Sequence, residues 1–317
     1  MHLAAGAAAL LAVSRVTWAQ AYPSRPVRIL VGFAAGGTSD IVGRLLSQWL
    51  SERLGQQFIV ENRPGASTNI ATEAVARAAA DGYTLLLIGG VNTINATLFD
   101  KLSFDFLRDI APVASVFETP LVVEVNPSVP VHTIPEFITY AKDNVGKLNM
   151  GTPGVGTPPH VAGELFKMMA GVDMVHVPYR GTGPMLTDLI GGQVQVAFDP
   201  LPASIEHIRA GKLRALAVTT ASRSDALPGI PSASESVPNY VASNWYGFAA
   251  PKNTPPEIVG KLNAEITAAL ADPKMRARLA ELGGTSFANS PTDFAKFVAD
   301  DTAKWAKVIR AANIKPQ

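Results

Sequence analysis

Short apolar runs alternate with longer segments of helical period along most of the chain. Val27–Val31 is such a run, and apolar residues then recur at helical spacing over residues 41–54. Gly55 follows this segment, at a position where a left-handed residue commonly ends a helix. The apolar runs 58–60 and 83–88 continue the alternation. The pattern predicts α/β units around a largely parallel sheet.

A second series of the same kind begins after Pro127. Thr133, with Glu136 three residues later, predicts a capping box and therefore a helix start. The apolar runs predict strands at 148–150, 174–177, 194–198 and 213–218, and the helical periods predict final helices at 256–271, 274–282 and 292–311.

Two apolar segments bounded by proline flank this second series, at 120–125 and 246–250. We expect them to be hinge strands that cross between two lobes. Lobe 1 then comprises residues 22–124 plus 246–317, and lobe 2 comprises residues 125–245. Such a chain is a two-lobed α/β protein with a ligand cleft between the lobes.

Charge and cysteine content narrow the function classes. Lys plus Arg (27) nearly balances Asp plus Glu (26), so the chain lacks the basic field that attracts nucleic acid. Because there is no cysteine, thiol nucleophiles, thiolate metal sites and disulfides are excluded. A length of 317 residues with 47% hydrophobic content is enough for two ordinary cores.

The N-terminus carries a candidate export signal. Residues 3–13 form an almost unbroken small and apolar run, and Ala19 and Ala21 after it are suitable cleavage positions. We expect residues 1–21 to be a signal peptide, cleaved near Ala19 or Ala21, and the mature protein to be exported. No Lys or Arg precedes the run, and a frayed N-terminal helix is the alternative.

Two glycine-rich loops, each between a buried strand and a helix, are the strongest binding candidates. One spans residues 32–40 in lobe 1 and the other 151–160 in lobe 2. Glycine leaves backbone N–H groups open to a ligand, and the following helix adds unpaired donors and the positive end of its dipole. Two such loops on opposite lobes favour a small carboxylate over a neutral sugar. Their candidate ligand-binding residues are Phe33, Ala34, Gly36, Gly37, Thr38, Asp40, Gly154, Val155, Gly156, Thr157 and His160.

Several of these residues also have a structural explanation. Thr38 and Thr157 stand where helix caps are common. Asp40 repels a carboxylate, so it fits better as a group that fixes the loop, neutralises helix donors or meets a ligand amino group. His160 is either an anion donor or a structural histidine. Loops at the carboxyl ends of strands, where α/β sheets bind ligands, supply the remaining candidates: Asn92, Thr93, Tyr179 and Asp199.

Short motifs spread over the mature chain resemble those of one known family. They are Tyr22-Pro23-Ser24-Arg25-Pro26-Val27, Gly36-Gly37-Thr38-Ser39-Asp40, Val60-Glu61-Asn62-Arg63-Pro64-Gly65-Ala66, Asp81-Gly82-Tyr83-Thr84-Leu85, Val177-Pro178-Tyr179-Arg180-Gly181 and Gly191-Gly192-Gln193-Val194. In them the chain is similar to the Bug family of tripartite tricarboxylate transporter solute receptors.

This resemblance implies a type II periplasmic binding fold, with two α/β lobes, a ligand cleft and two crossing hinge strands. It implies that the two glycine loops form a carboxylate pincer, acting through backbone N–H groups and water. The implied partners are integral membrane transporter subunits, and we expect the receptor itself to be a monomer. Ala34-Ala35 stands where the family often has proline, which could shift the first loop and the preferred ligand.

Two other function classes compete with this interpretation. Gly32, Ala34 and Gly37 imitate a dinucleotide-binding G-x-G-x-x-G, but Ala34 places a Cβ where the pyrophosphate must approach. The sequence has no P-loop, no G-x-S-x-G and no H-E-x-x-H, so we expect no catalysis, no cofactor and no metal. A ligand-sensing subunit of a signalling system is the second alternative, which the sequence does not separate from transport.

Overall fold

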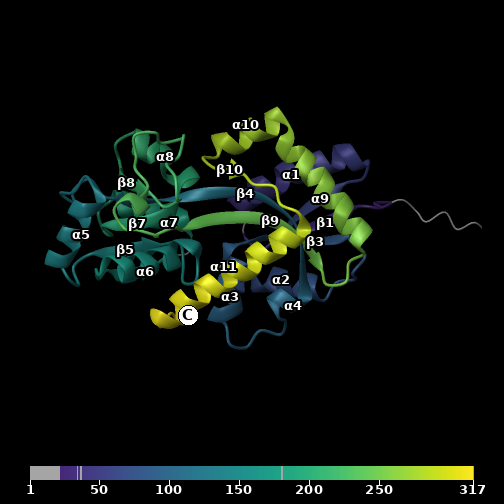
Figure 1. The fold of residues 1–317 in the computed structure, drawn as a ribbon, viewed down its shortest axis with the longest axis horizontal. Coiled ribbons are helices and arrows are strands. Elements are labelled where there is room, and N and C mark those ends of the chain that lie inside the picture. The colour runs from purple at the N-terminus through teal and green to yellow at the C-terminus, as the bar shows by residue number, and fades with distance from the viewer. Residues whose placement is uncertain (1–21, 34, 36–37, 180, 317) are drawn as a thin grey trace, which may run out of the picture.

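The computed structural model describes residues 22–316 except 34, 36–37 and 180. Helices pack on both faces of a long sheet, in the mixed α/β arrangement that the sequence predicts (Figure 1). The strand order is β2-β1-β3-β9-β4-β7-β5-β6, with β8 and β10 also paired to β4. The strands are β1 (Val27–Val31), β2 (Phe58–Asn62), β3 (Thr84–Gly89), β4 (Ile110–Val125), β5 (Asn149–Thr152), β6 (Val175–Pro178), β7 (Val196–Pro200), β8 (Arg214–Val218), β9 (Ser243–Pro251) and β10 (Thr285–Ser286).

The helices begin and end close to the residues that the sequence signals indicate. Thr133 caps α5 as predicted, by accepting a hydrogen bond from the Glu136 N–H. The reciprocal bond of a capping box is replaced, because the Glu136 carboxylate accepts the N–H of His132 and not that of Thr133. The helices are α1 (Thr38–Leu54), η1 (Ala66–Thr68), α2 (Asn69–Ala76), α3 (Gly90–Leu98), α4 (Phe106–Asp109), α5 (Ile134–Asp143), α6 (Pro158–Ala170), α7 (Thr182–Ile190), α8 (Leu201–Arg209), η2 (Ala233–Glu235), α9 (Pro256–Ala271), α10 (Pro273–Glu281) and α11 (Pro291–Ala311).

The half of the sheet built from β1, β3 and β9 is buried on both faces, as its unbroken apolar runs predict. Ile29 and Val31 face a core formed with α1, α9 and α10. Leu30, between them in sequence, faces a second core formed with α2 and α11. Because successive side chains of a strand point to opposite faces, a strand covered by helices on both sides is apolar over most of its length, and Arg28 is the exposed exception in β1.

The long strand β4 belongs to both halves of the sheet. From Ile110 to Pro120 it pairs antiparallel with β9, and from Leu121 to Val125 it pairs with β7 and β8. The sequence analysis predicted only residues 120–125 of this strand, as an apolar segment bounded by proline. Pro112 lies beside an irregularity in the β4–β9 register, where a strand tolerates proline.

The other half of the sheet, β7, β5 and β6, carries its own core beneath α5 and α6. Met150, Phe166 and Phe198 are fully buried there. Ile94 and Leu98 of α3 and Trp305, Val308 and Ile309 of α11 belong to the same cluster, although both helices also pack on the first half. Figure 1 shows α11 running from one half of the molecule to the other. The two halves are therefore joined by packed helices as well as by strands.

Among the described residues, none of the helices combines the length and apolar character that a membrane crossing requires.

Candidate functional site

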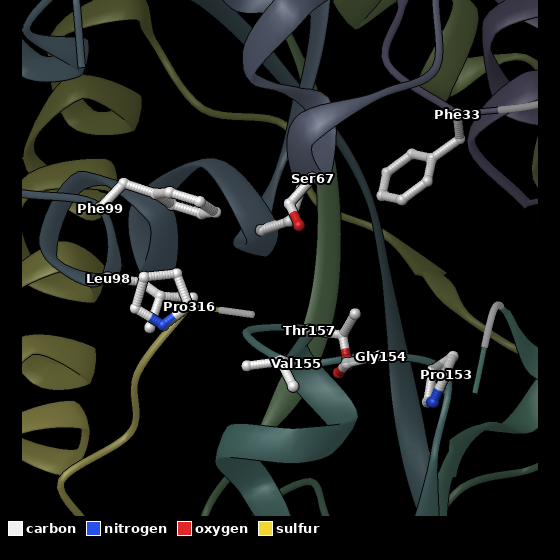
Figure 2. A pocket seen from close by; sticks show the side chains of 10 residues that line it. Phe33, Ser67, Leu98, Phe99, Pro153, Gly154, Val155, Thr157 and Pro316 are labelled. Atoms are coloured by element: carbon white, nitrogen blue, oxygen red, sulfur yellow. The ribbon is translucent and has the colours of Figure 1, made fainter. Parts of the chain in front are cut away.

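A cavity of about 230 Å³ lies where the two glycine-rich loops come together (Figure 2). Phe33 reaches it from the loop after β1, and Gly154 and Thr157 reach it from the loop after β5. The full set of described lining residues is Phe33, Ser67, Val91, Leu98, Phe99, Pro153, Gly154, Val155, Thr157 and Pro316. Four of the sequence-predicted ligand residues, Phe33, Gly154, Val155 and Thr157, thus share one space.

The first loop is held against the sheet by a short chain of polar contacts. Asp40, almost fully buried, accepts hydrogen bonds from Arg44 Nε and Asn62 Nδ2, each at 3.0 Å. Asn62 Nδ2 also donates to the Phe33 carbonyl at 3.0 Å. Asp40 therefore fixes the loop, which was one of its three expected roles. Thr38 begins α1, and its side chain hydrogen-bonds the Tyr246 hydroxyl.

Three of the residues predicted in this loop, Ala34, Gly36 and Gly37, lie outside the described residues. Gly32 before them packs closely on Thr68, since a Cβ added there would lie less than 3.0 Å from the Thr68 side chain. The loop after β1 and the segment η1 therefore form one wall of the cleft.

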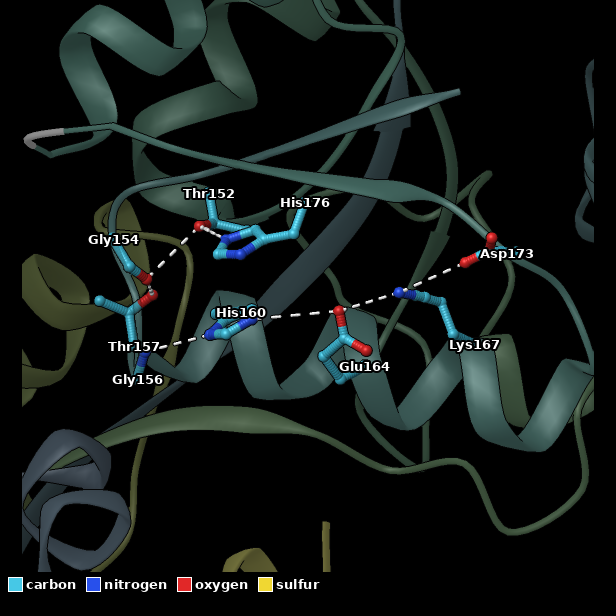
Figure 3. A network of polar contacts seen from close by, with 9 residues as sticks. All are labelled: Thr152, Gly154, Gly156, Thr157, His160, Glu164, Lys167, Asp173 and His176. Carbon is cyan, nitrogen blue, oxygen red and sulfur yellow. Dashed lines mark hydrogen bonds and ion pairs between the residues drawn. The ribbon is translucent and has the colours of Figure 1, made fainter. Parts of the chain in front are cut away.

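The second loop is hydrogen-bonded to a stacked pair of histidines, His160 and His176 (Figure 3). His160 Nδ1 accepts the Gly156 N–H at 3.1 Å, and its ring stacks on His176 with centroids 3.8 Å apart. His176 Nε2 lies 2.6 Å from the Thr152 hydroxyl, which anchors the ring to β5. Thr157 closes the loop by donating its hydroxyl to the Gly154 carbonyl at 2.8 Å.

Both histidines are neutral at pH 7. Burial, and then the neighbouring His176 and Lys167, lower the pKa of His160 to about 3. Burial and Lys167 lower the pKa of His176 to about 4. His160 is 4% exposed and does not line the cavity, so it supports the loop as an acceptor and brings no positive charge to it.

Backbone donors are distributed unevenly over this loop. The Gly156 N–H is taken by His160, whereas the N–H groups of Gly154 and Val155 have no hydrogen-bond partner within the described chain. Helix α6 adds few donors, because its first two residues, Pro158 and Pro159, have no N–H. The N–H donors of this loop that lie on the cavity without a partner in the described chain are therefore those of Gly154 and Val155.

The prediction that Asn92 and Thr93 lie in an open loop was wrong. Both are in α3 and almost fully buried, and neither lines the cavity. Asn92 Oδ1 accepts the Gly89 N–H at 2.9 Å, so the side chain caps its own helix. Thr93 donates to Asp301 of α11 at 2.6 Å, so it ties α3 to α11.

Tyr179 and Asp199 are also placed away from the cavity lining. The Tyr179 hydroxyl donates to Asp188 at 2.7 Å, and burial together with this bond raises its pKa to about 12. Asp199 is fully buried, and Ser204 Oγ lies 3.1 Å from it and 2.8 Å from Glu124. Burial raises the pKa of Asp199 to about 7 and, with the nearby Asp199, raises that of Glu124 well above its usual value.

Sequence reasoning missed several lining residues, of which Ser67 is the most informative. Ala66, Ser67 and Thr68 all have positive φ, at 45°, 51° and 74°, although none is glycine. Consecutive left-handed residues of this kind are costly and collect at functional sites. The Pro64-Gly65 pair is typical of a turn. Nothing in the sequence indicates that the residues after this turn face the cleft.

Comparison with known proteins decides the family. Residues 42–314 match the model of the tripartite tricarboxylate transporter family receptor, TctC. The chain belongs to this family. Its members are periplasmic solute-binding receptors and not enzymes, and solved periplasmic binding proteins with two lobes share the fold of this receptor. The resemblance to Bug proteins and the predicted fold class are therefore confirmed.

Individual relatives cover nearly the whole receptor. Protein BugT of Bordetella pertussis is 36% identical over 300 residues, which is 94% of this chain and 92% of BugT. The solved structure of R. palustris Rpa4515 with adipate is 38% identical, with a TM-score of 0.86, covering 93% of this chain and 100% of that one. MatC (Rpa3494) from Rhodopseudomonas palustris with bound malate is 33% identical, with a TM-score of 0.81, covering 91% and 100%.

Proposed function

We propose that this receptor captures a small carboxylate between its lobes and delivers it to the integral membrane subunits of a tripartite tricarboxylate-type transporter. One observation carries the proposal: the unpartnered N–H groups of Gly154 and Val155 lie on the same cavity as Phe33 of the opposite loop. Backbone N–H groups of this kind bind carboxylate oxygens. Relatives with bound adipate and malate support the ligand class.

The proposed mechanism is closure of lobe 1 (residues 22–124 plus 246–317) on lobe 2 (125–245). Its support is that β4 belongs to both halves of the sheet and that β9 pairs with it up to the junction. A carboxylate bridging the two loops favours the closed state by its extra contacts there. Small-angle scattering should show a smaller radius of gyration with ligand than without it.

We also propose that the receptor works as a monomer in the periplasm, after removal of residues 1–21 near Ala19 or Ala21. This segment lies outside the described residues. The mass of the protein recovered from a periplasmic extract tests the cleavage position, and light scattering of the same sample tests the monomer.

The binding proposal is tested with a pair of substitutions at residue 155. Val155→Pro removes the N–H donor, whereas Val155→Ala keeps it and only shortens the side chain. Because hydrogen bonds to charged groups contribute about 1.5–3 kcal/mol, we expect Val155→Pro to weaken binding about 10- to 100-fold beyond Val155→Ala. Calorimetric titration of the mature protein with adipate and malate measures this difference. Equal affinities in the two variants contradict the assignment.

A further inference from the structure

The walls of the cavity indicate what the ligand carries besides its carboxylate. Seven of the ten described lining residues are apolar side chains, and none of the ten is charged. Polar groups lie at Gly154, Val155 N–H and Thr157 on one side and at the Ser67 hydroxyl on the opposite side, while Phe99 and Leu98 of the α3 end form an apolar stretch of the wall. The cavity is therefore amphipathic.

Two aromatic rings define the apolar part. In Figure 2 the rings of Phe33 and Phe99 lie on opposite sides of Ser67, with the Gly154 loop below. Phe33 is 39% exposed and belongs to none of the hydrophobic cores of the described chain. A large exposed aromatic side chain at the edge of a cavity is typical of a ligand-binding surface.

A second carboxylate on the ligand would have no cationic side chain with which to form an ion pair among the described lining residues. Placed against Phe99 and Leu98, it would lose hydration without gaining an ion pair, which is unfavourable. An apolar body in the same place gains free energy by leaving water. The volume is sufficient, because a cavity of about 150 Å³ accommodates benzene and this one is about 230 Å³.

From this arrangement we infer that the preferred ligand is a monocarboxylate with an apolar body, either an aromatic ring or a medium-length alkyl chain. The carboxylate lies on the Gly154 and Val155 N–H groups, and the body lies between Phe33 and Phe99. The inference rests on the proposed carboxylate-binding function and specifies its substrate class. It distinguishes this receptor from its malate-bound relative, since malate is short and hydroxylated.

A homologous series tests the inference directly. Calorimetric titration of the mature protein uses butanoate, pentanoate, hexanoate and benzoate, with malate and adipate for comparison. Each added methylene should tighten binding about fourfold until the cavity is filled, since burial of a methylene contributes about 0.8 kcal/mol. Hexanoate and benzoate should bind more tightly than malate.

The same titrations separate the two proposals. If affinity is flat along the series, or if malate or adipate binds more tightly than hexanoate and benzoate, the inference of a monocarboxylate with an apolar body is wrong while carboxylate binding stands. If none of the acids binds, including adipate and malate, the proposed function itself is wrong.

A substitution at Phe33 locates the apolar part. Phe33→Ala should weaken hexanoate binding about tenfold and butanoate binding much less, because the longer chain makes more contact with the ring. The exposed position outside every core leaves the fold intact. Val145→Ala, at a residue 63% exposed and away from the cavity, is the control and should change neither affinity. Equal losses for both acids in Phe33→Ala contradict the inference.

Discussion

Leu98, at the end of α3, packs directly against Gly156 in the loop before α6. A Cβ at residue 156 would lie less than 3.0 Å from Leu98 Cδ2, and Gly156 has a φ of 73°. Helix α3 packs on β3 and β9 of the first half, and Gly156 follows β5 of the second half. The contact therefore joins the two sides of the cleft beside the cavity, which Leu98 and the neighbouring Val155 line.

We expect Gly156→Ala to lower the free energy of unfolding more than a matched change elsewhere. Gly146→Ala is the match, because Gly146 has a φ of 74° and no atom within 4 Å of an added Cβ. Left-handed backbone alone should cost about 1–2 kcal/mol in both variants. Overpacking against Leu98 should cost about 1–3 kcal/mol more in Gly156→Ala. Urea denaturation measures both, and equal losses contradict the packing argument.

Thr93→Val is predicted to weaken the fold without affecting the ligand. The Thr93 hydroxyl donates to Asp301, which also accepts the Trp245 indole N–H at 3.0 Å. Removing one donor from this nearly buried carboxylate should cost about 1–3 kcal/mol of unfolding free energy. Thr93→Ser keeps the hydroxyl and should lose less. A drop in adipate affinity at unchanged stability would show that Thr93 contacts the ligand after all.

His160 should be replaceable only by a side chain that can accept the Gly156 N–H. His160→Ala leaves this buried donor unpaired, at a cost of about 1–3 kcal/mol, and His160→Asn should cost less because its amide oxygen is an acceptor. Folding lowers the pKa of His160 from 6.5 to about 3. Between these pH values the imidazole is therefore protonated in the unfolded chain and neutral in the folded chain. The contribution of His160 to the free energy of unfolding should therefore decrease as pH falls from about 6.5 towards 3. Relative to the wild type, both variants should consequently gain stability over this range, as urea denaturation at each pH measures.

The raised pKa of Asp199 predicts a contribution to the free energy of unfolding that changes with pH in the opposite direction, over an overlapping pH range. Its pKa rises from 3.8 to about 7, so between these values the folded chain holds a proton that the unfolded chain has released. The free energy of unfolding contributed by this group falls as pH rises, by at most about 1.4 kcal/mol per pH unit. Asp199→Asn removes the group.

The stability of Asp199→Asn relative to the wild type should consequently increase between about pH 4 and pH 7. Urea denaturation of the two proteins at each pH gives this difference, which reports Asp199 together with the adjacent Glu124, whose pKa Asp199 raises. A difference that stays constant with pH would mean that Asp199 titrates normally in the folded receptor.

The amino-acid sequence by itself determined the local elements and the positions of the two glycine-rich loops. Apolar runs identified β1 and β3, and the Thr133 cap located the start of α5. Such signals are readable because strand burial and helix caps depend on residues that are neighbours in sequence. Glycine placed between strand and helix indicated the loops that carry Phe33 and Gly154 to the cavity.

Only the tertiary structure decided which polar residues face the cavity and which face the interior. Asn92 and Thr93 follow a strand and have the composition of a loop, yet distant partners on α2 and α11 turn them inward as part of a buried helix. His160 likewise accepts the Gly156 N–H and stacks on His176, and it does not face the cleft. Leu98, Phe99 and Pro316 reach the cavity because α3 and the C-terminal segment pack across it. These outcomes depend on contacts between residues far apart in the chain, for which local patterning carries no signal.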